Sequence, residues 1–521
     1  METFEWIIIL LAGAALLSAL ARRLGIPYPT LLAVGGAALA FVPNNPGWTL
    51  DPHLALALFV APVLLDAAYD SSPRDMRDNW RSVASLAILA VGATTAAVAI
   101  VAKWLVPDMP WPVAIALGAI VAPPDAAAAT AIVRQVRLPH RILAILEGES
   151  LVNDASALLV YRLAVIAAVS GSVSAWTIVP TFLVVVIGSV AAGIVLGWLL
   201  LRVIGNFHDI PTSIIVQFCT TFGVWILAEA VGLSGILTIV TFAVFIAQRV
   251  RLSQTARLRV PTNAVWATVV FVLNIFAFVL IGMQLRPIWE RLDAGQRESY
   301  FITAAIVLVT AVVIRFAWVM AYTAVTLAFK KGPGGTETEA RPTFRGSVVV
   351  SWAGMRGIVT LATAFAVPEM LANGQPFPYR DLVLLCAFAV VFGTLVVQGL
   401  TLKPLILWMN LTGDDTVGRE VRWARIESYR AAIAAIDGDQ SEEADRLRRE
   451  YSQAIEVGTR DEDAGVEDLP ENHIRRTAIM AARSRANALR LEGRIGDEAY
   501  RTLESEFDWI ELGASGARIA P

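Results

Sequence analysis

The chain is poor in charge. Of its 521 residues, 17% are Asp, Glu, Lys or Arg, against about 25% in an average soluble protein. Hydrophobic residues make up 56% of the chain. So little charge over so long a chain excludes an ordinary soluble protein and indicates a membrane protein. The lipid bilayer is therefore an expected partner.

Cysteine and histidine are also scarce. The two cysteines, Cys219 and Cys386, lie apart in apolar runs, which excludes a disulfide framework and a thiolate metal site. The four histidines have no metal-ligand spacing, and no HExxH motif occurs. We therefore expect no cofactor, no tightly bound metal and no enzymatic activity. Basic residues are spread over short loops, so nucleic acid is not an expected partner.

The few charges divide the chain in two. From Leu411 onward there are 16 Arg and no Lys against 24 Asp and Glu, a net charge of −8; the remainder carries 26 basic and 21 acidic residues, a net charge of +5. The acidic part alternates apolar and charged residues at helical spacing, with breaks at Asp437–Asp439 and Arg494–Gly496. We predict a transmembrane domain over 1–410 and a small helical tail over 411–521.

Apolar segments that are candidates for membrane-spanning helices, which need about 20 residues, recur throughout the first part. The thirteen segments are 4–21, 28–43, 53–69, 82–106, 112–133, 142–169, 178–204, 212–231, 234–248, 264–285, 300–329, 346–370 and 382–409. Seventeen Arg and Lys residues fall in one alternating set of loops and five in the other. This bias predicts an external N-terminus and a cytoplasmic tail. The fold class is an all-α polytopic membrane protein.

One apolar segment carries acids where a membrane helix normally holds only hydrocarbon. In the stretch EGESLVNDASALLVY (147–161), Asp154 lies about 18 Å along the helix, near the middle of a core about 30 Å thick. A carboxylate there costs about 2.5–3.5 kcal/mol on insertion scales, so it is a functional candidate. Ser150 and Asp154 share one helix face, and Glu149 and Asn153 share the adjoining face. An ion pair that merely joins two helices is the alternative interpretation.

Two spans contain residues that interrupt a helix. Pro123 and Pro124 lie in mid-span, so the helix should break there, free its preceding carbonyls and let Asp125 cap the second half. The sequence Gly354-Met355-Arg356-Gly357 lies about 16 Å into the span 346–370 and predicts a second break. Either break alone is compatible with a simple kink. Two breaks beside buried acids indicate an ion site at the midplane of a transporter.

The charge of Arg356 is permanent, so this residue needs a buried acid. We expect Glu149 to be its partner, because a fixed pair would hold the Ser150 and Asp154 face in place. Asp66 in the third span is a further acid for the same cavity, with a position at the inner rim as the alternative. Three other charged residues are interpreted as structural ion pairs or rim residues: Arg162, Glu229 and Arg315.

These motifs together resemble the sodium/proton exchanger branch of the monovalent cation:proton antiporters. The resemblance rests on Gly148-Glu149-Ser150 followed by Asn153-Asp154, on Asp125 in a broken span, and on Gly354 to Gly357, and it covers roughly residues 1–410. It implies thirteen spans in two inverted repeats, with a dimerisation domain and a moving core domain. It also implies a homodimer in the bacterial inner membrane.

For the site, the resemblance implies that Asp154 binds cation and proton in turn and that Ser150 contributes to the cation site. Glu149 and Arg356 would form the orienting pair, and Asn153 marks the electroneutral branch.

Two positions depart from the family pattern. Pro124 stands where a hydroxyl or small residue is usual, and Asp66 stands where Glu is frequent. Both departures bear on the ion preference, not on exchange itself.

The predicted function is exchange of Na⁺ or Li⁺ for H⁺ at one buried carboxylate. Hard cations prefer oxygen ligands, and these are supplied by Asp154, by Ser150 and by carbonyls near Pro124, with Asp125 and Asp66 as further acids. Exchange is electroneutral if a single acid carries both ions. A K⁺/H⁺ antiporter of the same fold is the main alternative. A cation channel, which needs no proton return, is the other.

Overall fold

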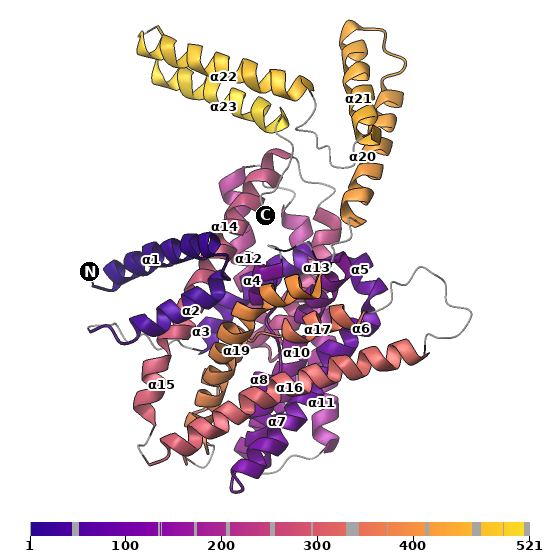
Figure 1. Cartoon of the computed structure of the whole chain (residues 1–521). Helices are drawn as coiled ribbons and strands as arrows, with labels where there is room; N and C mark the ends of the chain where they lie inside the picture. The colour runs from indigo at the N-terminus through magenta and orange to yellow at the C-terminus, as the bar shows by residue number, and fades with distance from the viewer. Residues whose placement is uncertain are drawn as a thin grey trace. The chain divides into compact units, whose positions relative to one another are not determined.

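The computed structural model describes residues 2–43, 52–133, 136, 138–170, 175–204, 209–250, 256–292, 295–329, 343–371, 374–411, 416–460, 470–492 and 494–514. Within these residues the regular elements are helices, apart from an isolated bridge between Met370 and Pro376. The predicted all-α class is confirmed. The chain divides into two compact units, Met1–Thr412 and Gly413–Pro521 (Figure 1).

The helices of the first unit follow the thirteen predicted segments in order. They are α1 (Glu2–Leu24), α2 (Tyr28–Leu39), α3 (Pro52–Ala55), η1 (Leu56–Val60), α4 (Ala61–Asp70), α5 (Pro73–Asp78), α6 (Trp80–Ala84), η2 (Ser85–Ala90), α7 (Val91–Leu105), α8 (Trp111–Val121), α9 (Ala126–Val133), α10 (His140–Ser170), α11 (Ala175–Ile204), α12 (Ile210–Ala230), α13 (Gly235–Val250), α14 (Ala256–Met283), α15 (Leu285–Arg291), α16 (Arg297–Phe329), α17 (Phe344–Trp352), α18 (Ile358–Phe365) and α19 (Arg380–Met409). Among the described residues, eight helical stretches are long and apolar enough to cross a membrane.

Both predicted interruptions are confirmed. The segment 112–133 forms α8 and α9, which are separated at Ala122–Asp125, and the segment 346–370 forms α17 and α18, which are separated at Ala353–Gly357. In the first case the rings of Pro123 and Pro124 prevent a continuous helix. The predicted segment extends to residue 370, but α18 ends at Phe365. Pro368 disfavours a helical backbone at the residue before it, Val367.

Two spans contain a feature that their sequences did not indicate. The predicted helices 53–69 and 82–106 each contain a π-helical segment, η1 and η2 respectively. A π turn inserts an extra residue into the helix, shifts the register of the side chains that follow, and is frequent at functional sites. No local residue preference announces such a turn.

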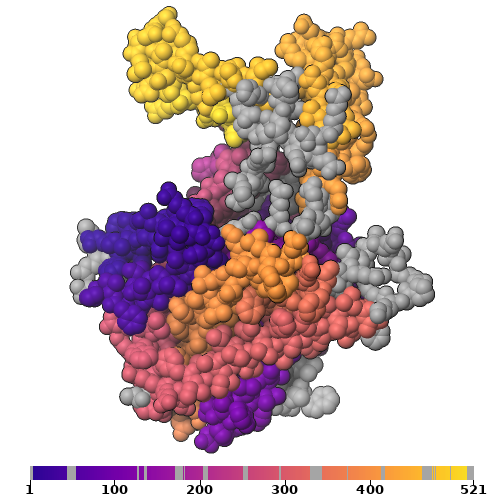
Figure 2. All heavy atoms as spheres, in the orientation of Figure 1, coloured from indigo at the N-terminus to yellow at the C-terminus, as the bar shows by residue number. Residues whose placement is uncertain are grey.

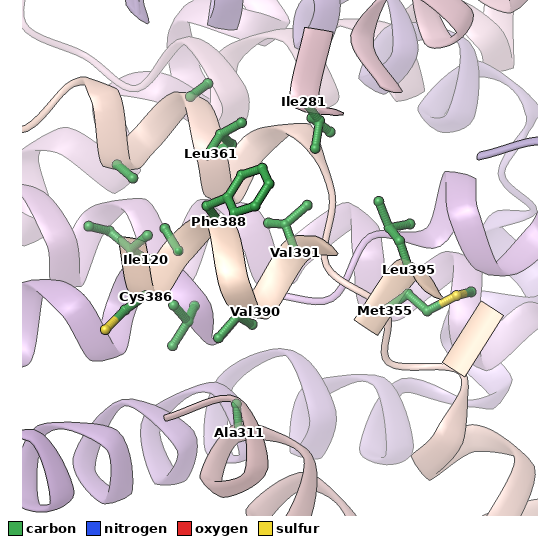
Figure 3. Packing of buried hydrophobic residues seen from close by; sticks show 14 of the residues in the cluster. Ile120, Ile281, Ala311, Met355, Leu361, Cys386, Phe388, Val390, Val391 and Leu395 are labelled. Carbon is green, nitrogen blue, oxygen red and sulfur yellow. The ribbon is translucent and has the colours of Figure 1, made fainter. Parts of the chain in front are cut away.

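The core of the first unit is built around α19, whose side chains meet both interrupted helices. Figure 3 shows Ile120 of α8, Leu361 of α18 and Phe388 of α19 in one cluster, with Met355 of the second interruption beside Leu395. These five side chains are all buried. In Figure 2, side chains of α16 and α19, which pack together, cover adjoining strips of one face of the unit. The two breaks are thus embedded in protein, as irregular backbone at membrane depth requires.

The second unit consists of two helical hairpins, α20 (Thr416–Ala435) with α21 (Glu442–Arg460) and α22 (Pro470–Leu491) with α23 (Asp497–Ala514). The predicted helical tail, with breaks at 437–439 and 494–496, is confirmed. Tyr429 and Tyr451 stack across the first hairpin with ring centroids 5.1 Å apart, and Arg483 pairs with Asp508 and Glu511 across the second.

Candidate functional site

The two interruptions are bonded to each other through their backbones. The amide of Asp125 donates to the carbonyl of Met355 at 2.6 Å. In the opposite direction, the side chain of Arg356 donates from Nε to the carbonyl of Val121 at 3.1 Å. Each break therefore satisfies polar groups that the other leaves free, and the crossing of the two broken helices is held by hydrogen bonds rather than by apolar packing alone.

A carboxylate lies where two half-helices begin. Asp125 immediately precedes α9, and its side chain lies against Gly357, the N-cap residue of α18. A Cβ atom at position 357 would overlap the Asp125 carboxylate, so only glycine fits there. Helix N-termini carry free amides and a partial positive charge, which favour an anionic group. The predicted capping position of Asp125 thus belongs to a crossing of two helix starts.

An arginine lies where the other two half-helices end. Arg356 is fully buried and donates to three carbonyls: from Nε to Val121, the last residue of α8, from Nη1 to Gly354 beyond the end of α17 at 2.5 Å, and from Nη2 to Ala311 of α16 at 3.2 Å. Its backbone amide donates to Oγ1 of Thr394 on α19 at 3.0 Å. Helix C-termini present free carbonyls with partial negative charge, so they can neutralise a buried guanidinium.

The expected ion pair between Glu149 and Arg356 is therefore wrong. Glu149 pairs instead with Arg315 of α16, with Nη1 to Oε1 at 2.5 Å and Nη2 to Oε2 at 2.9 Å. The two side chains are 1% and 3% exposed. Arg356 does not need an acid, because the interruptions supply carbonyls that a continuous helix would have kept for itself. The interpretation of Arg315 as a structural ion-pair residue is confirmed.

The Glu149–Arg315 pair also supports the second interruption. Nη2 of Arg315 donates to the carbonyl of Val350 in α17 at 3.2 Å. Its side chain occupies the space beside Gly354, where a Cβ atom would overlap it. Both glycines of the GMRG sequence are thus required by close approach, Gly354 by an arginine and Gly357 by an aspartate.

Asn153 connects α10 to the first interruption. Its Nδ2 donates to the carbonyl of Pro124 at 2.9 Å, and its fully buried Oδ1 has no hydrogen-bond partner among the described residues. The freed carbonyl that the sequence predicted at Pro124 is present, and it accepts from Asn153. This contact was missed at the level of sequence, because an amide has no charge to reveal its partner.

Asp154 is buried, with 6% of its surface exposed, and lies within electrostatic reach of Asp125. Among the described residues, no lysine or arginine pairs with it, and no group of three or more metal-ligating side chains is preassembled. Ser150 lies one turn earlier on α10 and is half-buried. The fold therefore brings two acids, Asp125 and Asp154, to the crossing, and no described residue is a cationic partner of Asp154.

Asp66 lies on α4, which flanks the same stretch of α10. Leu64 and Ala155 belong to one apolar cluster, and Ala68 and Leu151 belong to another. Asp66 itself is half-buried. Its helix lies beside the site, and its assignment as a third acid of the site stays a prediction.

The π segment η2 is attached to the site helix. Oγ of Ser156 on α10 donates to the carbonyl of Ala87 in η2 at 2.6 Å, and Nε1 of Trp318 on α16 donates to Oγ of Ser85 at 3.2 Å. The segment η2 thus forms hydrogen bonds with two neighbouring helices, α10 and α16. Its partner on α10, Ser156, lies two residues after Asp154 in the chain.

A cavity of about 610 Å³ lies along α10 between Ala155 and Ile166. Its lining includes Ala155 and Leu158, which follow Asp154 on the same helix, and residues of η1, α12, α13 and α18. Arg162 also lines it and pairs with Glu229 of α12 at 2.6 and 2.7 Å. These two residues, which were expected to be structural ion-pair or rim residues, form an ion pair with each other. The cavity gives an approach to the residue next to Asp154.

Known proteins resemble this chain in sequence and in fold. A family model described as the transmembrane sodium/hydrogen exchanger matches residues 7–408. The sodium, potassium, lithium and rubidium/H⁺ antiporter of Bacillus pumilus is 29% identical over 98% of this chain and 78% of its own length. The uncharacterized Na⁺/H⁺ exchanger YjcE of Escherichia coli is 31% identical over 98% of both chains. The solved structure of the antiporter MjNhaP1 from Methanocaldococcus jannaschii has a similar fold, with TM-score 0.62 and 17% identity over 80% of this chain and 99% of its own.

Proposed function

Since the chain belongs to the sodium/hydrogen exchanger family and is a cation/proton antiporter, not an enzyme, we propose that Asp154 is the group for which cation and proton compete. The observation that carries this proposal is the placement of Asp154: buried, beside the crossing of two interrupted helices, and without a cationic partner among the described residues. A carboxylate already neutralised by an arginine would have little affinity for Na⁺. Glu149, which does have an arginine, is unsuited to the role for the same reason.

The cation ligands that we propose are oxygens near the crossing. The carboxylate of Asp154 is joined by the hydroxyl of Ser150, the carboxylate of Asp125 and Oδ1 of Asn153, which accepts no hydrogen bond from the described residues. Small hard cations favour such oxygen donors. The carbonyl of Pro124 keeps a second lone pair after it accepts from Asn153, so it remains a possible ligand.

One acid that carries both ions makes the exchange electroneutral. When Asp154 releases its proton to one side and takes up Na⁺, a single positive charge moves in each direction per cycle. Asn153 fits this stoichiometry because it holds the first interruption with an amide rather than with a second titratable acid. We propose that the protein acts as a homodimer in the cell membrane, with an external N-terminus and a cytoplasmic tail.

The second candidate function is exchange of K⁺ for H⁺ at the same site. The Bacillus pumilus relative is an antiporter of sodium, potassium, lithium and rubidium, which favours a site that also takes K⁺. Proteoliposomes with a trapped pH-sensitive dye would compare the three cations under a potassium/valinomycin clamp. Na⁺-driven dequenching that is insensitive to the clamp voltage supports electroneutral exchange. A current with a reversal potential set by the cation gradient alone would identify a channel.

Replacing Asp154→Asn tests the assignment directly. We expect loss of exchange by at least about 100-fold, because the amide neither binds a proton in this pH range nor carries charge to a cation. The matched control is Asp70→Asn, a change of the same kind at an exposed residue at the end of α4. Wild-type exchange should weaken as pH falls at fixed Na⁺ and recover when Na⁺ is raised. Exchange retained in Asp154→Asn would transfer the role to Asp125 or Asp66.

A further inference from the structure

An ion pair lines the cavity that extends to Ala155, the residue after Asp154. Arg162 lies on α10, eight residues and therefore about 12 Å beyond Asp154. Both oxygens of the Glu229 carboxylate accept from its Nη2, at 2.6 and 2.7 Å, and Nη1 donates to the carbonyl of Leu233 at 3.4 Å. The two side chains are 38% and 33% exposed. The pair thus links the helix that carries the site to the end of α12 and to the turn that follows it.

The acceptor of this pair is held in place independently of Arg162. Oε1 of Glu229 also accepts from the amide of Gly235, the first residue of α13, at 3.0 Å. The amide of the neighbouring Ser234 donates to Oγ of Ser189 on α11 at 2.9 Å. The carboxylate is therefore fixed among α11, α12 and α13 at the start of a helix, where an anion is favoured. Arg162 is the part of the pair that belongs to α10.

Arg162 lies midway along the part of α10 that lines the cavity. On α10, Leu158 lines the cavity on the side of Asp154, whereas Val165 and Ile166 line it beyond Arg162. Most other lining residues are apolar, so a hydrated ion has few polar contacts in the passage apart from this pair. An ion that moves along α10 from the level of Ile166 to that of Ala155 passes the level of Arg162.

We propose that the Arg162–Glu229 pair is a gate on the side of the membrane at which α10 ends, which is expected to be external. Closed, it joins α10 to the α11–α13 group and bars access to Asp154; open, it releases α10 and admits water and cations. This inference rests on the proposed function of Asp154, because it assigns a gate to that site. Arg162 and Glu229 act on access and take no part in ion binding.

The test measures accessibility and does not require exchange activity. In a background with Cys219→Ser and Cys386→Ala, a single cysteine is placed at Leu158→Cys, and a membrane-impermeant maleimide is added to either side of vesicles of known orientation. Glu229→Gln and Arg162→Gln should each raise the labelling rate from the α10-end side about three- to fivefold, the upper part of the range expected when a partly exposed pair is lost. The double variant should add little to either single variant, as expected for two residues that act as a pair.

Controls separate the gate from general loosening. Ile166→Cys lies beyond the pair and is exposed, so its labelling should stay within about twofold in all variants. Glu290→Gln breaks an exposed pair with Arg286 within α15 and should leave Leu158→Cys unaffected. Unchanged labelling in both gate variants, additive effects in the double variant, or a rise from the opposite side only would overturn the proposal. Exchange retained in Asp154→Asn, with labelling as expected, would refute the proposed role of Asp154 while the control of access by the pair would still be supported.

Discussion

The two interruptions of the membrane unit meet at one crossing, yet they arise in different ways. The break between α8 and α9 is made by Pro123 and Pro124, whose rings exclude a continuous helix in any surroundings. The break between α17 and α18 has no proline. Its Gly354 and Gly357 make room for Arg315 of α16 and for Asp125 of the first interruption. The first break is therefore intrinsic to its segment, whereas the second depends on its neighbours.

This difference predicts that the glycine break is the more sensitive of the two to changes elsewhere in the chain. The largest effect is expected for Glu149→Gln, which leaves Arg315 charged, buried and without its acid beside Gly354. Breaking a buried ion pair by removing one partner costs about 3–5 kcal/mol. The folded fraction after heating, followed by size-exclusion chromatography in detergent, measures the loss. Replacing Glu290→Gln on the surface is the matched control, and equal heat resistance of the two variants would contradict this account of the pair.

Gly357→Ala should have the next largest effect. The added methyl overlaps the Asp125 carboxylate, and overpacking of this kind costs about 1–3 kcal/mol and displaces the side chain it meets. We expect cation exchange to fall more than stability, because Asp125 is displaced next to Asp154. Gly223→Ala on α12 meets open space and serves as the control. Normal exchange by Gly357→Ala would show that the position of Asp125 is not critical.

Asn153→Ala removes the side-chain hydrogen bond to the proline break. The carbonyl of Pro124 then loses its buried donor, at a cost of about 1–3 kcal/mol. Exchange should weaken mainly through a higher Na⁺ concentration at half-maximal rate, because the carbonyl and the lost Oδ1 both lie at the proposed cation site. An unchanged Na⁺ dependence would restrict Asn153 to a structural role.

Pro124→Ala is expected to have the smallest effect. Alanine keeps the carbonyl that accepts from Asn153, and the amide of Asp125 still bonds to Met355. Pro123 remains to prevent a continuous helix. The exchange rate should stay within about tenfold of wild type. The free energy of unfolding should fall by about 1 kcal/mol at most. A loss as large as that of Gly357→Ala would mean that the two breaks do not differ as described.

Much of the fold was determined by the sequence alone. The apolar segments predicted the thirteen helical regions, since burial in lipid requires long hydrocarbon-rich helices whatever their partners. The proline break, the glycine break and the helical tail were also predictable, because rings, missing side chains and apolar periodicity act locally. Asp154 was found because a carboxylate in an apolar run is costly wherever the helix packs.

Only the tertiary structure decided which charges pair. Arg315 and Arg356 are both basic residues in apolar spans, and nothing local assigns Glu149 to one or the other. The fold places Arg356 at the carbonyl ends of α8 and α17, which neutralise it, and Arg315 beside Glu149. Such a choice depends on which helix ends cross. Helix dipoles and released carbonyls appear only once the backbone is folded. They therefore cannot be predicted from the types of side chain in the sequence.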